Sequence, residues 1–239
     1  FITYNLTLNR AHEGMLLNFI SILFILPFFF LSATAGQLAD KYHRDKIAKI
    51  LKCIEFVLML LTAVAVFFKF YSGLIIILFF MSVQSAFFGP VKYSIIPQHL
   101  EECELIEGNA IIDGATYFSI LIGTILGAHI TSPNITVGIL VFCSLVGMLS
   151  SFKIPSAPAP RPDLSMSFNI FKTLRLTLKK ISEIRSIYIT ILGLSWFWAL
   201  GAVILTQLYP MCSDLLGLSR NAVAVFMFIF SLGMAAGTL

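Results

Sequence analysis

The chain has 239 residues, of which 58% are hydrophobic and only 12% are charged. Soluble domains contain about 45–50% apolar and about 25% charged residues, so a body of this size could not hide this much apolar surface from water. A soluble enzyme, a disordered tail and a disulfide-rich secreted domain are therefore excluded. The formal net charge of +4 does not indicate nucleic acid as a partner, because the 16 Lys and Arg residues are dispersed along a hydrophobic chain.

Seven apolar runs are long enough to cross a bilayer, which takes about 20 residues of α-helix. In chain order they are approximately residues 15–38, 47–68, 71–89, 109–130, 135–152, 186–209 and 219–239. The runs do not alternate between apolar and polar residues as the strands of a membrane barrel do. The predicted fold is therefore an all-α membrane protein with seven transmembrane helices.

Basic residues indicate which side each connecting segment faces, because cytoplasmic loops are enriched in Lys and Arg. One side carries nearly all of them: Lys41, Arg44, Lys46, Lys49, Lys52, Lys92, Lys153, Arg161, Lys172, Arg175, Lys179, Lys180 and Arg185. The opposite side carries Arg10, Lys69 and Arg220. If successive spans alternate in direction, the chain starts outside and its last span ends inside.

The longest polar segment, residues 153–185, has two parts. Residues 154–162 hold four of the nine prolines, which predicts an extended stretch that cannot enter the bilayer. In residues 166–185, apolar side chains recur near helical spacing and basic side chains occupy the other positions; the apolar ones are Phe168, Phe171, Leu174, Leu178 and Ile181. We interpret this part as an amphipathic helix on the inner membrane surface, acting either as a solvated connector or as a site for anionic lipid.

The two ends of the sequence predict a larger parent protein. Residue 1 is Phe rather than Met, and the apolar run that starts at Ala222 continues to Leu239 with no polar anchor. We expect residues 1–152 to be an N-terminal half that lacks its first helix, residues 153–185 to be a cytoplasmic linker, and residues 186–239 to be the first two helices of a second half. Two helical halves joined by a basic linker are typical of secondary transporters.

The first cytoplasmic loop contains the motif G-Q-L-A-D-K-Y-H-R at residues 36–44. Gly36 would let two backbones approach closely, and Asp40 could cap the following turn and pair with Arg44 or Lys46. The motif resembles the G-x-L-A-D-K/R loop of the major facilitator superfamily, with His43 where that pattern usually has Gly. The resemblance implies a conformational latch formed by Gly36, Asp40 and Arg44, whereas an ordinary basic turn is the alternative.

A second, more specific motif runs from F-G-P-V-K-Y-S-I-I-P at residues 88–97 to G-N-A-I-I-D-G-A-T at residues 108–116. We expect Pro90 and Pro97 to prevent a continuous helix, because proline lacks the backbone donor. The two runs resemble the bacterial lysophospholipid transporter branch of the superfamily. They also resemble the transporter module of fused acyltransferase/acyl-carrier-protein synthetase proteins.

This resemblance implies a transporter of the bacterial inner membrane that moves lysophospholipid, such as lysophosphatidylethanolamine, from the outer to the inner leaflet by alternating access, for reacylation. A zwitterionic head group needs a cation for its phosphate and a carboxylate for its ammonium. Lys92 could bind the phosphate and Asp113 the ammonium, with Asn109 donating hydrogen bonds. Alternatively, both charged residues cap helices or reach to the membrane surface. An associated or fused acyltransferase is a possible partner.

Other chemistry is not indicated by the sequence. It contains no ATP-binding G-x-x-x-x-G-K-S/T loop, no His followed five positions later by Asp as in acyltransferases, and no His or Cys pair at metal-site spacing. We therefore expect no enzyme activity, catalytic residue, metal or cofactor. Lys52 and Glu55 should form an ion pair on one helix face. The functions left open are a drug or metabolite exporter of the same superfamily and a non-catalytic membrane module of a fused acyltransferase.

Overall fold

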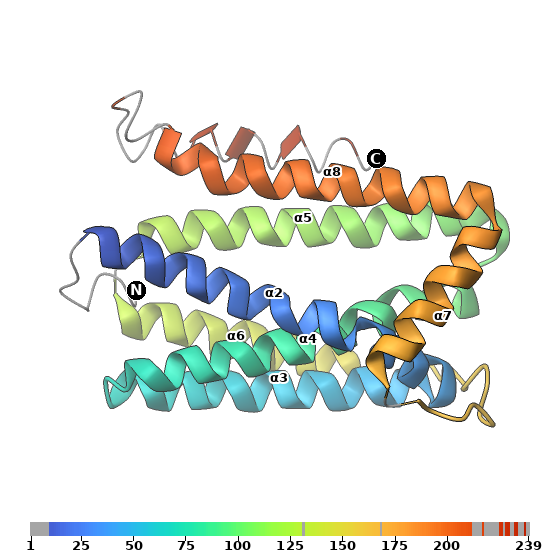
Figure 1. Cartoon of the computed structure of the whole chain (residues 1–239). Coiled ribbons are helices and arrows are strands. Elements are labelled where there is room, and N and C mark those ends of the chain that lie inside the picture. Colours follow the sequence, from blue (N-terminus) through green and yellow to red (C-terminus); the bar gives the residue numbers. More distant parts are fainter. Residues whose placement is uncertain are drawn as a thin grey trace. The chain divides into compact units, whose positions relative to one another are not determined.

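The computed structural model describes residues 10–130, 132–167 and 169–211, together with residues 217, 225–226, 228–229, 232–233 and 237 (Figure 1). Most residues of the continuous ranges are helical, the main exception being the linker between α6 and α7, and no strand occurs among the described residues. The elements are α2 (Arg10–Lys41), α3 (Arg44–Phe67), α4 (Tyr71–His99), the short 3-10 turn η1 (Glu102–Glu104), α5 (Leu105–His129), α6 (Pro133–Ser151), α7 (Ile170–Glu183) and α8 (Arg185–Pro210).

The helix lengths confirm the prediction of an all-α membrane protein. Five of the described helical segments are long and apolar enough to cross a membrane, and α7 with α8, bent by 116° at their junction, forms a sixth candidate. The five segments overlap the first five predicted spans in order, and α8 corresponds to the sixth. The predicted span at residues 219–239 lies outside the continuously described residues.

By their contacts, the residues divide into two compact units. The first comprises Phe1–Glu102 and Ile130–Thr173, and the second comprises Cys103–His129 and Leu174–Leu239. In the first unit, α4 packs along both α2 and α3, and α6 packs along α3. In the second unit, α5 and α8 run side by side (Figure 1). The predicted division at residues 152 and 185 stays a prediction.

The core of the first unit lies where α2, α3 and α4 meet near the basic loop. Its buried members are Ala39, Ile47, Ala48, Leu51 and Val91, and Ile154 of the linker packs against them. Small alanines let the helix backbones approach closely, which favours packing where lipid supplies no hydrophobic driving force. Many large apolar side chains elsewhere point outward, as expected for helices surrounded by lipid tails.

The expectation that Pro90 and Pro97 would break the helix is wrong, because α4 continues through both to His99. Each proline removes one donor from the backbone ladder. In a membrane helix this loss is tolerated when neighbouring helices hold the segment in place. Here Val91 is fully buried and Ile96 is 5% exposed, so packing of the segment between the two prolines holds it within α4. The predicted span 71–89 is therefore ten residues short of the observed helix end.

Candidate functional site

Arg44, at the start of α3, joins the ends of three helices. Its Nε donates to the carbonyl of Ala39 on α2 at 3.0 Å, and its Nη1 donates to the carbonyl of Ser94 on α4 at 2.7 Å. Its Nη2 lies 3.5 Å from the Asp40 carboxylate, so the predicted pair between these two residues is present. Only 9% of Arg44 is exposed. The planar guanidinium suits this position because it directs several donors at once.

One detail of the loop prediction is wrong, and another stays a prediction. Among the described residues, a Cβ added at Gly36 would meet nothing within 4 Å, so the close backbone approach expected at Gly36 stays a prediction. Asp40 does not cap α3, because it is still part of α2 and the N-cap position is His43, which makes no side-chain cap bond. The loop is held instead by the Arg44 side chain.

The proline-rich linker is hydrogen-bonded to this loop. The N–H of Ala157 donates to Asp45 Oδ1 at 3.1 Å, and the N–H of Arg44 donates to the carbonyl of Ala157 at 2.9 Å. Further along, the N–H of Arg161 donates to the carbonyl of Asp40 at 2.9 Å. Ala157 is completely buried. We call these linker residues, 154–161, the clasp.

The end of α4 also contacts the clasp, where Gln98 Nε2 donates to the carbonyl of Pro158 at 2.9 Å. Sequence reasoning predicted an extended linker but missed its attachment. One signal was available: between Pro155 and Pro160 only Ser156, Ala157 and Ala159 carry an N–H, so a buried member of this set needs a dedicated acceptor. Asp45 supplies that acceptor.

A polar cluster lies deeper along α3. Lys52 Nζ is 2.8 Å from Glu55 Oε2, which confirms the predicted ion pair. The same carboxylate oxygen accepts from Gln84 Nε2 of α4 at 3.2 Å, and Lys52 Nζ lies 4.6 Å from the centre of the Phe88 ring. Lys52 is eight residues into α3, which places it about 12 Å along the helix axis. An ion pair at this depth needs partners on neighbouring helices, and Gln84 and Phe88 provide them.

The predicted head-group residues belong to different units. Lys92 is in α4 of the first unit, with its Nζ 4.6 Å from the centre of the Tyr93 ring. Asn109 and Asp113 are in α5 of the second unit, and the Asn109 amide donates to the carbonyl of Leu105 at 2.7 Å. All three residues are partly buried. Their role in binding stays a prediction.

Asp113 shares a face of α5 with Tyr117, a residue that the sequence analysis did not identify as a site residue. Asn109, Asp113 and Tyr117 follow one another at four-residue spacing, so their side chains share one side of the helix. The ring of Tyr117 stacks on Trp198 of α8, with centroids 6.1 Å apart and ring planes inclined by 24°. The second unit thus combines an amide, a carboxylate and a phenol along one face of α5, and the phenol ring stacks on Trp198 of α8.

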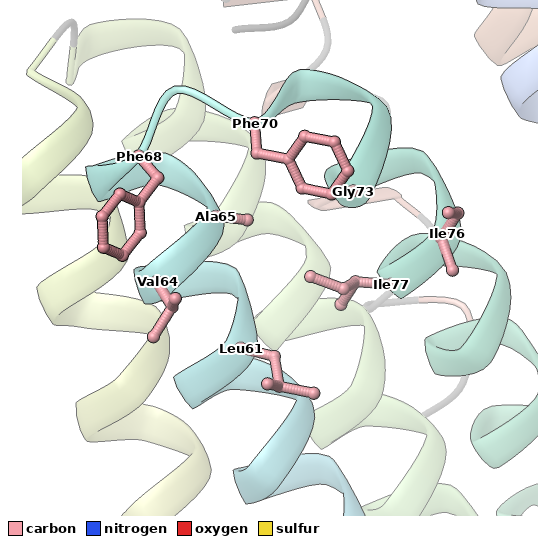
Figure 2. Close-up of a pocket in the computed structure, with 8 residues that line it drawn as sticks. All are labelled: Leu61, Val64, Ala65, Phe68, Phe70, Gly73, Ile76 and Ile77. Atoms are coloured by element: carbon pink, nitrogen blue, oxygen red, sulfur yellow. The ribbon is translucent and has the colours of Figure 1, made fainter.

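An apolar hollow of about 460 Å³ lies in the first unit, beside the turn between α3 and α4 (Figure 2). Its lining consists of Leu61, Val64, Ala65, Phe68, Phe70, Gly73, Ile76 and Ile77. Figure 2 shows the Phe70 ring directly above Gly73. The volume is within the range of small-molecule sites, about 300–1,000 Å³. A hollow with this lining can hold an aliphatic chain but offers nothing to a charged group.

Comparison with known proteins gives consistent matches. The family model described as Major Facilitator Superfamily matches residues 2–239. The chain is 24% identical to the lysophospholipid transporter LplT of Photorhabdus laumondii, over 85% of this chain and 50% of that protein. It is 23% identical to the lysophospholipid transporter LplT of Klebsiella pneumoniae, over 87% of this chain and 52% of that protein. The chain therefore spans about half the length of these relatives. Since the family model covers nearly the whole sequence, the chain belongs to the Major Facilitator Superfamily.

Proposed function

We propose that this chain is part of a secondary transporter that moves a lysophospholipid from the outer to the inner leaflet of a bacterial inner membrane. The observation that carries the proposal is the motif pair at residues 88–97 and 108–116, in a chain that matches relatives named as lysophospholipid transporters. The apolar helices support a multi-pass membrane protein. The basic first loop and the linker would face the cytoplasm.

The head group and the acyl chain of a lysophospholipid need different binding environments in the protein. A phosphate can be bound by the Lys92 ammonium, and a primary ammonium by the Asp113 carboxylate. Asn109, one turn before Asp113, places an amide on the same helix face. Tyr117 and Trp198 extend that face with aromatic rings. We propose that these residues contribute to binding a lysophosphatidylethanolamine-like head group during alternating access.

The acyl chain needs only an apolar environment, which the helix surfaces and the hollow beside Phe70 both offer. For the loop, we propose that Gly36, Asp40 and Arg44 act as the conformational latch. The support is that Arg44 already ties α2, α3 and α4 together on one side of the membrane. An acyltransferase that consumes the delivered lysophospholipid would be the natural partner of this activity.

The direct test is transport by the full-length protein reconstituted in vesicles, with fluorescent lysophosphatidylethanolamine added to one leaflet. We expect Lys92→Ala and Asp113→Asn to reduce the initial rate on the order of tenfold or more, because each leaves one charge of the head group without its partner. Matched controls are Lys153→Ala and Glu107→Gln, which change exposed side chains of the same types. Both controls should transport at the normal rate.

A panel of amphiphiles separates this proposal from the alternatives. Lysophospholipid movement that is faster than that of cationic drugs supports the proposal. Drug export without lysophospholipid movement would favour an exporter of the same superfamily. Normal lysophospholipid transport by both Lys92→Ala and Asp113→Asn would leave the transport function intact but reject the head-group assignment.

A further inference from the structure

Helix α7 has two chemically different sides. Leu174, Leu178 and Ile181 recur at spacings of four and three residues, which places them on one side of the helix. The basic residues Lys172, Arg175, Lys179 and Lys180 occupy other positions around it, and Leu176 is the apolar exception among them. The side chain of Asn169 caps the helix by accepting the N–H of Lys172 at 3.0 Å. α7 is therefore a well-defined amphipathic helix.

The start of α7 is fixed at the end of a membrane span. Gln37 of α2 lies four residues before the helix end at Lys41. Its side-chain oxygen accepts the N–H of Ser167 at 3.0 Å, and its side-chain nitrogen donates to the Thr173 hydroxyl at 3.2 Å. Thr173 is only 8% exposed. The first turn of α7 thus lies at the level where α2 leaves the hydrocarbon, on the side that carries the basic first loop.

The orientation of α7 follows from its junction with α8. The two helices meet at Ile184 with a bend of 116°, which Figure 1 shows as a sharp corner. If α8 crosses the membrane, a helix at this angle runs close to the membrane plane. Leu178 is 53% exposed and Phe171 is 70% exposed, so the apolar side is available to lipid.

From these observations we propose that α7 lies in the inner-leaflet interface and binds the head groups of anionic phospholipids. Arg175, Lys179 and Lys180 are exposed and share one helix with apolar anchors, and Arg185 lies two residues beyond its last residue. Glu183 is the only acidic residue of α7, so the helix is strongly cationic. The charge selects an anionic surface, and the apolar side excludes a purely aqueous position. The inference concerns lipid binding by the linker and does not depend on which substrate is transported.

The test places a fluorophore on a single cysteine in the full-length protein, in a background without native cysteines. A fluorophore on Leu178→Cys reports on the apolar side of α7, and a fluorophore on Leu176→Cys reports on the opposite side. The protein is placed in two nanodisc samples. One contains brominated phosphatidylglycerol, and the other contains the same fraction of brominated phosphatidylcholine. We expect quenching at position 178 to exceed that at 176, and phosphatidylglycerol to quench more strongly than phosphatidylcholine.

Charge variants then test the cause of the preference. Replacing Lys172, Arg175, Lys179 and Lys180 by Gln should reduce the preference for phosphatidylglycerol on the order of tenfold, because each basic residue near an anionic surface adds to the attraction. Replacing the three lysines of this set by Arg retains the charge and should retain the preference. A matched control removes the same charge elsewhere, through Lys41→Gln, Lys46→Gln, Lys69→Gln and Lys153→Gln.

Three results would overturn the proposal. Equal quenching by both lipids in the unmodified helix would show that α7 does not select anionic head groups. An equal loss in the matched control would show that any basic residue suffices. If neither lipid quenches the fluorophore at position 178, and an added soluble protein shields this position, the apolar side binds a protein rather than the membrane.

Discussion

Asp45 and Ala157 are 112 residues apart, yet Asp45 Oδ1 accepts the N–H of Ala157 at 3.1 Å. The return bond comes from the neighbouring Arg44, whose N–H donates to the Ala157 carbonyl at 2.9 Å. Both partners are buried, with Asp45 5% exposed and Ala157 completely buried. The first part of the linker is therefore attached to the start of α3, and a free flexible spacer is the wrong description of residues 154–161.

The first prediction concerns this attachment. Asp45→Ala removes the acceptor of the Ala157 N–H, and a hydrogen bond to a charged group contributes about 1.5–3 kcal/mol. We expect the amides of the clasp to exchange with deuterium about ten to a hundred times faster in the variant. Hydrogen exchange followed by mass spectrometry measures this directly, because the peptide between Pro155 and Pro160 reports only three amides, those of Ser156, Ala157 and Ala159.

Two controls accompany the Asp45 variant. Asp45→Asn keeps an oxygen acceptor but loses the charge that pairs with Lys49 at 3.1 Å, so its exchange rate should be intermediate. Asp163→Ala removes an exposed carboxylate from the same linker and should leave exchange unchanged. If Asp45→Ala and Asp163→Ala behave alike, the clasp is held by other contacts.

The second prediction concerns the donors of Arg44. Arg44→Ala removes the hydrogen bonds to the carbonyls of Ala39 and Ser94, and it should lower the free energy of unfolding by about 1–3 kcal/mol. Arg44→Lys keeps the charge but not the fork of donors, so it should recover less than half of that loss.

Unfolding by SDS titration in mixed micelles gives the free energies. Lys46→Ala, an exposed neighbour, should stay within about 0.5 kcal/mol of the unmodified protein, and an equal cost at both positions would contradict the assignment.

The sequence predicts some of these features well, for physical reasons. Span positions follow from the length of apolar runs, because an α-helix needs about 20 residues to cross the bilayer with its backbone hydrogen bonds satisfied internally. The Lys52–Glu55 pair was predictable because three-residue spacing brings side chains together on any helix. The continuity of α4 was not predictable, because the loss at Pro90 and Pro97 is local whereas the compensating packing of Val91 comes from other helices.

The contacts that join distant segments could not be predicted for a related reason. The acceptors of Arg44 are main-chain carbonyls, which every residue carries, so no residue type marks Ala39 or Ser94 in advance. Gln84 meets Glu55 across 29 residues, and Ala157 meets Asp45 across 112. Such pairs depend on how the helices pack, which a single sequence does not specify.

The third prediction concerns the polar cluster of α3. Removing one partner of the ion pair, as in Glu55→Leu, leaves the Lys52 ammonium among apolar helices, whereas removing both charges leaves no such cost. We therefore expect a coupling energy of about 1–3 kcal/mol in the double-mutant cycle of Lys52→Met and Glu55→Leu. SDS titration of the four proteins measures it. Gln84→Leu should destabilise more when Glu55 is present than when it is absent, because Gln84 Nε2 donates to both the Glu55 carboxylate and the carbonyl of Leu51. Additive losses at Lys52 and Glu55 would show that the pair does not act as a unit.

The fourth prediction concerns the wall of the apolar hollow. A Cβ at Gly73 would overlap Phe70 Cδ1, so Gly73→Ala forces the Phe70 ring, which is 57% exposed, to move. Overpacking of this kind costs about 1–3 kcal/mol, while replacing Gly by Ala in a helix gains about 1 kcal/mol. The net effect of Gly73→Ala in the unmodified protein should therefore lie between neutral and a loss of about 2 kcal/mol. In a Phe70→Ala background the clash is absent, so the same substitution should stabilise. SDS titration of the four proteins measures the change in unfolding free energy that Gly73→Ala causes in each background. The control is Gly89→Ala, because an added Cβ there meets nothing within 4 Å among the described residues. An equal effect of Gly73→Ala in both backgrounds would show that the Phe70 ring does not occupy this position.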